Sequence, residues 1–364
     1  MHGYVFYSNN DSVTLGGTPS DEGVRGGIHI DADTQLITAL HGEATDFVPV
    51  TSVTQTATLE QMKASGAAWP AAHTDPHKLY MLANTFRSLT GIPVIRIPFE
   101  ITLEAEALGC ALNMGKMDKT PYVNEPVGHL PDSVPRDATS LGRVSVILEA
   151  LDLIEQKVPH DVPVVVGVTG PFTLAGHLAG IENLVKWTRT DPDTVQEYLT
   201  LATTFLNDYL ESLGTRSVDV VSILEPSAST DMISPSAFKR FVMPMLKELA
   251  DATETTKVLH ICGDCTPILE YMAQSGYSGL SVESAVSVKK ARRIVKESVS
   301  LVGNIDPVSV LLQGDHDTVA EATEKAILEG IDVVAPGCGL APATPTENIV
   351  TMRKETERIV NEYQ

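Results

Sequence analysis

An imidazole and a thiol stand two residues apart in the sequence His260-Ile261-Cys262, at the end of an apolar run. On a β-strand, residues i and i+2 point to the same face, so these two side chains converge on one point. A third candidate ligand, Cys338, ends another apolar run between two glycines, which let the backbone approach closely. The three side chains form the N/S/S donor set that zinc prefers. Three protein ligands leave one position open, which is typical of a catalytic zinc site.

Glu283 ends the apolar run that follows the His-x-Cys run, so its carboxylate is expected within reach of the same metal. A carboxylate is a harder and more easily displaced zinc ligand than a thiolate. It would therefore hold the fourth position at rest and leave when a substrate thiol arrives. The alternative is a solvated or salt-bridged glutamate at a strand end.

The remaining cysteines have simpler interpretations. The spacing from Cys262 to Cys265 also matches a redox dithiol, and a His and a Cys at a strand end can be a satisfied core pair. Cys265 is expected in the turn beyond the strand, pointing away from the metal. Cys110 is expected to be buried and inert. Four cysteines are too few for a disulfide framework in a chain of this size.

Eight apolar runs bounded by turn residues predict eight strands. Most are continuous Val/Ile/Leu runs, as expected for parallel strands that are covered on both faces. They span residues 47–53, 93–98, 164–168, 218–224, 257–262, 278–283, 299–304 and 331–336.

Amphipathic stretches between these runs predict helices at 59–65, 77–89, 145–157, 192–213, 235–252, 266–275, 288–297 and 319–329. Eight strand–helix repeats predict an α/β fold of the (β/α)8 TIM barrel type, with a doubly wound open sheet as the alternative. Such a barrel carries its chemistry at the carboxyl ends of its strands, where His260, Cys262, Glu283 and Cys338 are expected.

Length and charge limit the classes of function. At 364 residues the chain is long enough for one large barrel or two ordinary domains. A formal net charge of −21 argues against nucleic acid and membrane surfaces as partners. No apolar run has the length of a membrane span, and residues 1–30 are polar, without the apolar core of a secretory signal. We expect a cytoplasmic protein with a flexible extension at 1–30 and a single barrel domain at 31–364, with an insertion around 99–140.

The sequence resembles the methylcobamide:coenzyme M methyltransferases, which belong to the uroporphyrinogen decarboxylase-like group of barrels. The resemblance runs from about residue 31 to the end of the chain, and the stretch at 54–69 looks most like the branch that works in methylamine metabolism. It is carried by His-Ile-Cys-Gly-Asp at 260–264, Gly-Leu-Ser-Val-Glu at 279–283, Val-Gly-Asn at 302–304, Ala-Pro-Gly-Cys-Gly at 335–339, and further matches at 54–58, 65–70, 72–75 and 94–98.

The resemblance implies methyl transfer from a methylated corrinoid protein to the thiol of coenzyme M, in methanogenesis from methylated compounds. It implies one zinc ion, with His260, Cys262 and Cys338 as ligands and Glu283 as the ligand exchanged for the thiol. No cobalamin-binding Asp-x-His-x-x-Gly pattern is present, so the corrinoid is expected on a separate protein that docks over the barrel mouth.

The sulfonate of coenzyme M needs a cation or a cluster of N–H donors. Arg96, near a strand end, is the candidate, and a structural salt bridge inside the barrel is the alternative role for it. Gln55, Ser227 and Asn304 also follow strand ends and are expected to line the pocket.

Three other functions remain open. Decarboxylation of a porphyrinogen occurs in the same group of barrels, but it uses carboxylate and arginine side chains and gives the His/Cys/Cys set no role. A zinc methyltransferase with another acceptor, such as homocysteine, would need groups for an amino acid's carboxylate and ammonium. A non-enzymatic corrinoid- or zinc-binding carrier would hold the metal tightly without turnover.

Overall fold

The computed structural model describes residues 32–55, 57–128, 130, 138–297 and 299–363. Its centre is a parallel seven-stranded sheet in the order β1-β4-β5-β6-β7-β8-β9, so neighbouring strands follow each other along the chain. The strands are β1 (Ile95–Ile97), β4 (Val164–Thr169), β5 (Val220–Leu224), β6 (Thr256–His260), β7 (Gly279–Val282), β8 (Ser300–Ile305) and β9 (Val333–Pro336).

The eighth predicted strand, at 47–53, is present only as a short bridge next to β9. Val50 pairs in parallel with Val334, whose N–H donates to Pro49 O at 2.9 Å. In return, Thr51 N–H donates to Val334 O at 3.0 Å. The segment therefore continues the curled sheet beyond β9, and the predicted TIM-barrel α/β fold is confirmed.

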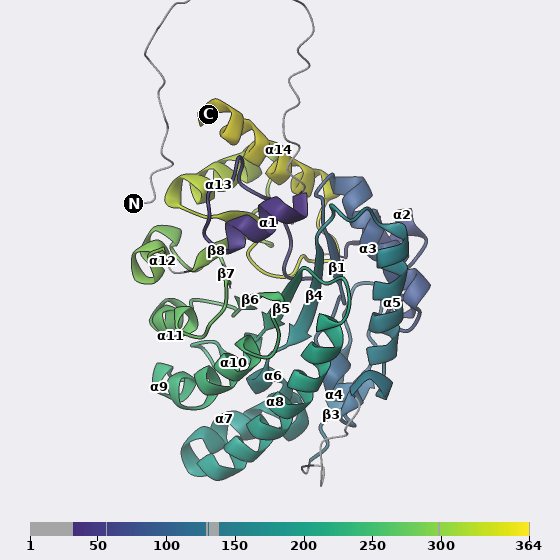
Figure 1. Ribbon diagram of the computed structural model, residues 1–364, viewed down its shortest axis with the longest axis vertical. Helices are drawn as coiled ribbons and strands as arrows, with labels where there is room; N and C mark the ends of the chain where they lie inside the picture. The colour runs from purple at the N-terminus through teal and green to yellow at the C-terminus, as the bar shows by residue number, and fades with distance from the viewer. Residues whose placement is uncertain (1–31, 56, 129, 131–137, 298, 364) are drawn as a thin grey trace, which may run out of the picture.

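Helices surround the sheet (Figure 1). Each predicted helix is present. The one predicted at 235–252 is divided into α9 (Pro235–Ala237), a π-helical turn (Phe238–Val242) and α10 (Met243–Ala250). The α-helices are α1 (Ala32–Leu40), α2 (Leu59–Ser65), α3 (Pro76–Thr90), α4 (Leu103–Ala107), α5 (Val144–Lys157), α6 (Pro171–Ala179), α7 (Ile181–Thr190), α8 (Pro192–Gly214), α9 (Pro235–Ala237), α10 (Met243–Ala250), α11 (Leu269–Ala273), α12 (Val288–Val295), α13 (His316–Glu329) and α14 (Thr346–Tyr363).

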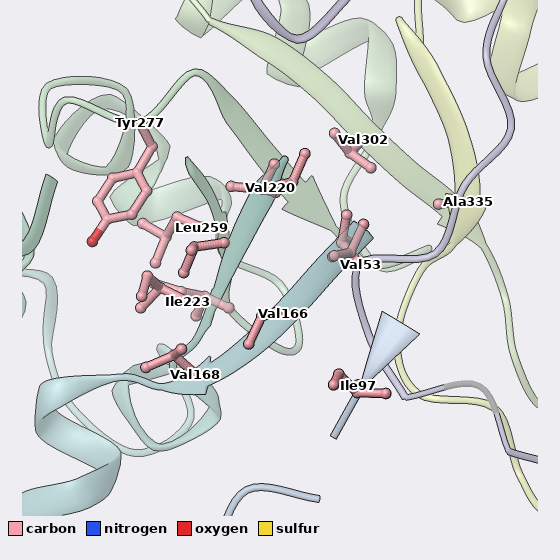
Figure 2. Packing of buried hydrophobic residues seen from close by; sticks show 14 of the residues in the cluster. Val53, Ile97, Val166, Val168, Val220, Ile223, Leu259, Tyr277, Val302 and Ala335 are labelled. Carbon is pink, nitrogen blue, oxygen red and sulfur yellow. The ribbon is translucent and has the colours of Figure 1, made fainter. Parts of the chain in front are cut away.

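Buried apolar side chains on neighbouring strands form rows that pack between the sheet and the helices. Val168, Ile223 and Leu259 are register partners on β4, β5 and β6, and Figure 2 shows Leu259 as the one nearest to Tyr277. The hydroxyl of Tyr277 donates to Leu246 O of α10 at 3.1 Å, which ties this row to the helix above it. All residues of β4 and β5 are buried, as the continuous apolar runs predict.

Helix α1 covers the amino ends of two strands. The hydroxyl of Ser300, the first residue of β8, donates to Ala39 O at 2.6 Å. A Cβ at Gly279, the first residue of β7, would lie 2.9 Å from Leu40 Cδ2, so the missing side chain lets the helix pack closely. Since α1 covers this end, chemistry is left to the carboxyl ends of the strands, as is usual in such barrels.

Between β1 and α5 the chain forms α4, an antiparallel hairpin of β2 (Ala111–Asn113) and β3 (Tyr122–Glu125), and a short 3-10 turn. The predicted insertion at 99–140 falls in this region, and part of it lies outside the described residues. The extension at 1–30 lies wholly outside them, so the division into an extension and one domain stays a prediction. None of the described helices is long and apolar enough to cross a membrane.

Candidate metal centre

Four predicted ligands meet at the carboxyl ends of three strands. His260 ends β6, Cys262 follows it, Glu283 follows β7 and Cys338 follows β9. One ligand atom from each residue can be chosen so that all four atoms lie within 4.8 Å of one another. The Sγ of Cys262 is 3.8 Å from the Sγ of Cys338 and 3.4 Å from the Nε2 of His260.

These spacings fit a tetrahedral zinc ion. Zn–S bonds of about 2.3 Å and Zn–N bonds of about 2.0–2.1 Å at tetrahedral angles place two sulfurs about 3.8 Å apart, and a nitrogen and a sulfur about 3.6 Å apart. The observed separations between Cys262, Cys338 and His260 agree with both values. The fit also selects Nε2 of His260, rather than Nδ1, as the ligand atom.

The charges of the site suit a dication. The contact between the two sulfurs raises the pKa of Cys262 and lowers the pKa of Cys338, so one of the two ionises much more readily than the other. Burial, followed by the adjacent Cys338 sulfur, raises the pKa of Glu283. Sulfur and carboxylate charges at such short range repel each other, and a bound cation would relieve that repulsion.

Local backbone features bring the Glu283 and Cys338 loops together. A Cβ at Gly337 would lie 3.2 Å from Glu283 Cα and 3.3 Å from Asn304 C, so the glycine lets the Cys338 loop pass close to both. The backbone N–H of Gly263 donates to the Glu283 carboxylate. Asn304 Nδ2 donates to Val286 O at 3.1 Å and to Glu283 O at 3.5 Å, which fixes the loop after β7.

Comparison with known proteins agrees with this site. The sequence profile of the uroporphyrinogen decarboxylase (URO-D) family matches residues 31–359. The chain is 38% identical over 320 residues to the methylcobamide:CoM methyltransferase MtaA of Methanosarcina barkeri, covering 87% of this chain and 94% of that protein. It is 35% identical over 327 residues to the methylcobamide:CoM methyltransferase MtbA of Methanosarcina acetivorans, covering 87% and 95%.

A solved structure described as a methyltransferase from Methanosarcina mazei superposes with a TM-score of 0.88 at 38% identity, covering 91% of this chain and 99% of that one. The chain belongs to the methylcobamide:CoM methyltransferases of the uroporphyrinogen decarboxylase family. The family expected from the sequence is thereby confirmed.

In this member of the methylcobamide:CoM methyltransferases, Gln55 lies against the Cys338 loop. The N–H of Leu340 donates to Gln55 O at 2.9 Å, and a Cβ at Gly339 would lie 3.5 Å from Gln55 Cβ. Ser227 is half-buried after β5, where its backbone N–H donates to Thr173 Oγ1 at 3.1 Å. Neither residue is among the four clustered ligands, so both stay predictions as pocket residues.

Arg96 lies in the middle of β1, and its side chain points into the barrel. It is 2% exposed, donates to Pro98 O, and would collide with a Cβ at Gly167. Its Nε and Nη2 have no hydrogen-bond partner within the described part of the chain, and no ion pair there includes it. Burial lowers the pKa of Arg96 to about 9, so the group is still a cation at neutral pH. The alternative of a structural salt bridge therefore finds no support in the described residues.

The other two cysteines lie outside the cluster. Cys265 is fully buried, and burial raises its pKa to about 12. Cys110 is buried and its thiol donates to His177 O at 3.5 Å. Cys262 has Cys338 and His260 as its thiol partners, so the geometry favours a metal site over a Cys262–Cys265 dithiol.

Sequence reasoning missed several buried polar groups around the site. Ser281 lies against His260, and Glu225 accepts the N–H groups of Phe172 and Thr173 at the start of α6. Burial raises the pKa of Glu225 to about 7. Ser281 had a sequence signal, because it stands two residues before Glu283 and therefore on the same face of the strand. Glu225 also had a signal, since it directly follows an apolar run, but its partners on α6 could not be predicted from the sequence.

Proposed function

We propose that this protein transfers a methyl group from a methylated corrinoid, carried by a separate protein, to the thiol of coenzyme M. One zinc ion would be held by His260 Nε2, Cys262, Cys338 and, before the thiol arrives, Glu283. The observation that supports this function most directly is the tetrahedral spacing of these donors at the carboxyl end of the barrel. The printed names of the relatives, which specify methylcobamide and CoM, supply the substrate class.

Each residue of the site has its own role in the proposed reaction. A bound zinc ion would favour the deprotonated form of a ligating thiol, which is the nucleophilic form. Cys262 and Cys338 contribute sulfur charge, and this keeps an incoming sulfur electron-rich. Glu283 is half-buried and held through the Gly263 N–H, so it can leave the fourth position without unfolding its strand. The barrel walls orient the thiol toward the methyl group, and orientation contributes much of the rate in such transfers.

Arg96 is the proposed partner of the sulfonate. If the segment at 47–53 is counted as the eighth position of the ring, β1 stands four positions from β7, on the opposite side of the barrel. An acceptor with its thiol near Glu283 would therefore direct its other end toward β1. A buried guanidinium with unpaired donors is costly, and a sulfonate would satisfy the free Nε and Nη2.

The deciding experiment is anaerobic mixing of the purified protein with methylcob(III)alamin and coenzyme M, followed by the absorbance of the methylcorrinoid. We expect demethylation that requires coenzyme M, is slower with homocysteine and stops when a chelator removes the metal. Zinc content without methyl transfer to any thiol would instead support a carrier. Absence of both zinc and transfer would reject the proposal.

The sulfonate contact has its own test with 2-mercaptoethanol, which has the same thiol but no sulfonate. Arg96→Lys and Arg96→Leu should raise the KM for coenzyme M by roughly 10- to 100-fold, the effect of losing a hydrogen bond to a charged group. The KM for 2-mercaptoethanol should stay near that of the wild type. Equal losses with both acceptors would remove Arg96 from the sulfonate site.

A further inference from the structure

We propose that Ser281 is a positioning residue of the metal centre, which selects the tautomer of His260 and orients its Nε2. This inference rests on the proposed function, since it concerns the same metal. Ser281 belongs to the Gly-Leu-Ser-Val-Glu stretch at 279–283, in which the metal site itself uses only Glu283.

The backbone places Ser281 directly beside His260. The two residues are register partners on the neighbouring parallel strands β7 and β6. Both are buried, with Ser281 fully inaccessible to solvent. Ser281 Oγ lies 3.0 Å from His260 Nδ1, which is the distance of a good hydrogen bond. His260 thus has one ring nitrogen against the serine and the other, Nε2, 3.4 Å from Cys262 Sγ.

A neutral imidazole carries one proton, so the partner of one nitrogen decides what the other can do. Nε2 can bind a metal only when its lone pair is free, which requires the proton on Nδ1. In that tautomer Nδ1–H donates to Ser281 Oγ. Partners of this kind commonly fix the ring orientation of a metal-binding histidine and raise its basicity.

The main chain alone does not fix the ring. The His260 carbonyl accepts a hydrogen bond from the Glu225 N–H at 2.9 Å. This bond fixes the position of the backbone at the end of β6. Rotation about the Cβ–Cγ bond would still swing Nε2 away from the two sulfurs, and Ser281 Oγ opposes that rotation. Ser281 and Glu283 are two residues apart, so they lie on the same face of the chain. Strand β7 and the residue after it therefore supply both the hydrogen-bond partner of His260 and the exchangeable ligand.

The test compares Ser281→Ala with Ser222→Ala. Ser222, on β5, is also fully buried, and its Oγ has no hydrogen-bond partner within the described residues, so the control deletes the same atom from a similar environment. Zinc affinity is measured by competition with a chromophoric chelator, and the geometry by the visible spectrum of the Co²⁺-loaded proteins. Urea unfolding of the metal-free proteins selects conditions in which all three are folded.

We expect Ser281→Ala to bind zinc about 10- to 100-fold more weakly than wild type, the usual effect of losing such a partner. Its Co²⁺ spectrum should change, while Ser222→Ala should match wild type in both measurements. Zinc affinity of Ser281→Ala equal to that of wild type, or an equal loss in Ser222→Ala, would overturn the inference and leave the proposed function standing. A wild-type protein that binds no zinc would overturn both.

Discussion

At the scale of single residues, the metal centre depends on which sulfur occupies which position. Cys262 and Cys338 lie at ligand distance from a common point, whereas Cys265, three residues further along, is sealed in the core. Cys262→Ala and Cys338→Ala should each lose bound zinc and methyl transfer, because each leaves one thiolate, one imidazole and a carboxylate that the incoming thiol displaces. Cys265→Ser is the matched control. Metal analysis after gel filtration checks this, and one equivalent of zinc retained in Cys338→Ala would contradict the assigned ligand set.

Glu283 gives a second prediction at this scale. Glu283→Gln keeps the shape of the side chain and removes its charge, so the three remaining ligands should still bind zinc. The fourth position, however, should no longer respond to the thiol as in wild type. The Co²⁺ spectrum, recorded with and without coenzyme M, measures that response. If Glu283→Gln and wild type gave the same two spectra, exchange of this ligand would be excluded.

At the scale of elements, the sequence predicted most of the barrel because its signal is local. Continuous apolar runs identified β4 to β9 closely, and helix α2 was predicted with both ends correct: Thr58 and Gln61 form a capping box, and Gly66 ends the helix with φ +67°. The segment at 47–53 is equally apolar but forms only a bridge, since pairing depends on a neighbour's register rather than on composition.

Several elements were missed, some of them because their sequences lack an amphipathic pattern. Helices α6 and α7 lie within residues 170–191, where Gly180 separates them and the apolar residues of α6 show no helical stripe, because almost every one is buried. The hairpin of β2 and β3 has mostly exposed residues and therefore no strand pattern. The His260/Cys262 pair was predictable from i, i+2 spacing, and Glu283 and Cys338 from their places at the ends of apolar runs, whereas Arg143 and its partners come together only through the fold.

Arg143 connects three elements and gives the prediction for this scale. Standing just before α5, it contacts Glu100 after β1 and, at 2.6 Å, Glu106 of α4, and donates to His73 O at 3.3 Å. Burial by itself would raise the pKa of Glu100, but the Arg143 guanidinium holds that pKa below its usual range. Arg143→Met should cost about 3–5 kcal/mol of unfolding free energy, because it leaves a buried carboxylate unpaired.

The double variant Arg143→Met/Glu100→Gln should recover part of this loss, since it removes the charge that was left without a partner. Urea unfolding followed by circular dichroism measures all three proteins. Lys116→Met, which breaks an exposed pair with Asp118, should be nearly silent. A double variant no more stable than Arg143→Met would mean that packing, rather than the pairing of charges, makes Arg143 important.

At the scale of the whole molecule, the proposed function requires the methyl donor to bind at the face where the carboxyl ends of the strands meet. Large apolar side chains are exposed on segments that follow these strand ends: Met117 and Tyr122 in the β2–β3 hairpin after β1, Met232 after β5 and Val308 after β8. We call these four residues the mouth set. Under the proposed function, a corrinoid-carrying protein docks at this face, so these exposed side chains should contribute to its binding.

Met117→Lys and Met232→Lys should therefore raise the KM for a methylated corrinoid protein by about tenfold each, the effect of losing ~1.4 kcal/mol of binding. Turnover with free methylcobalamin should not change, since a small donor needs no docking surface. Leu328→Lys is the control, because Leu328 is the most exposed large apolar side chain among the described residues, at 60%, but lies on helix α13, away from the mouth set. Steady-state rates with the two donors separate docking from chemistry. An equal loss with free methylcobalamin would place these methionines in the active site instead, and an equal effect of Leu328→Lys would show that added charge, not the mouth set, weakens the complex.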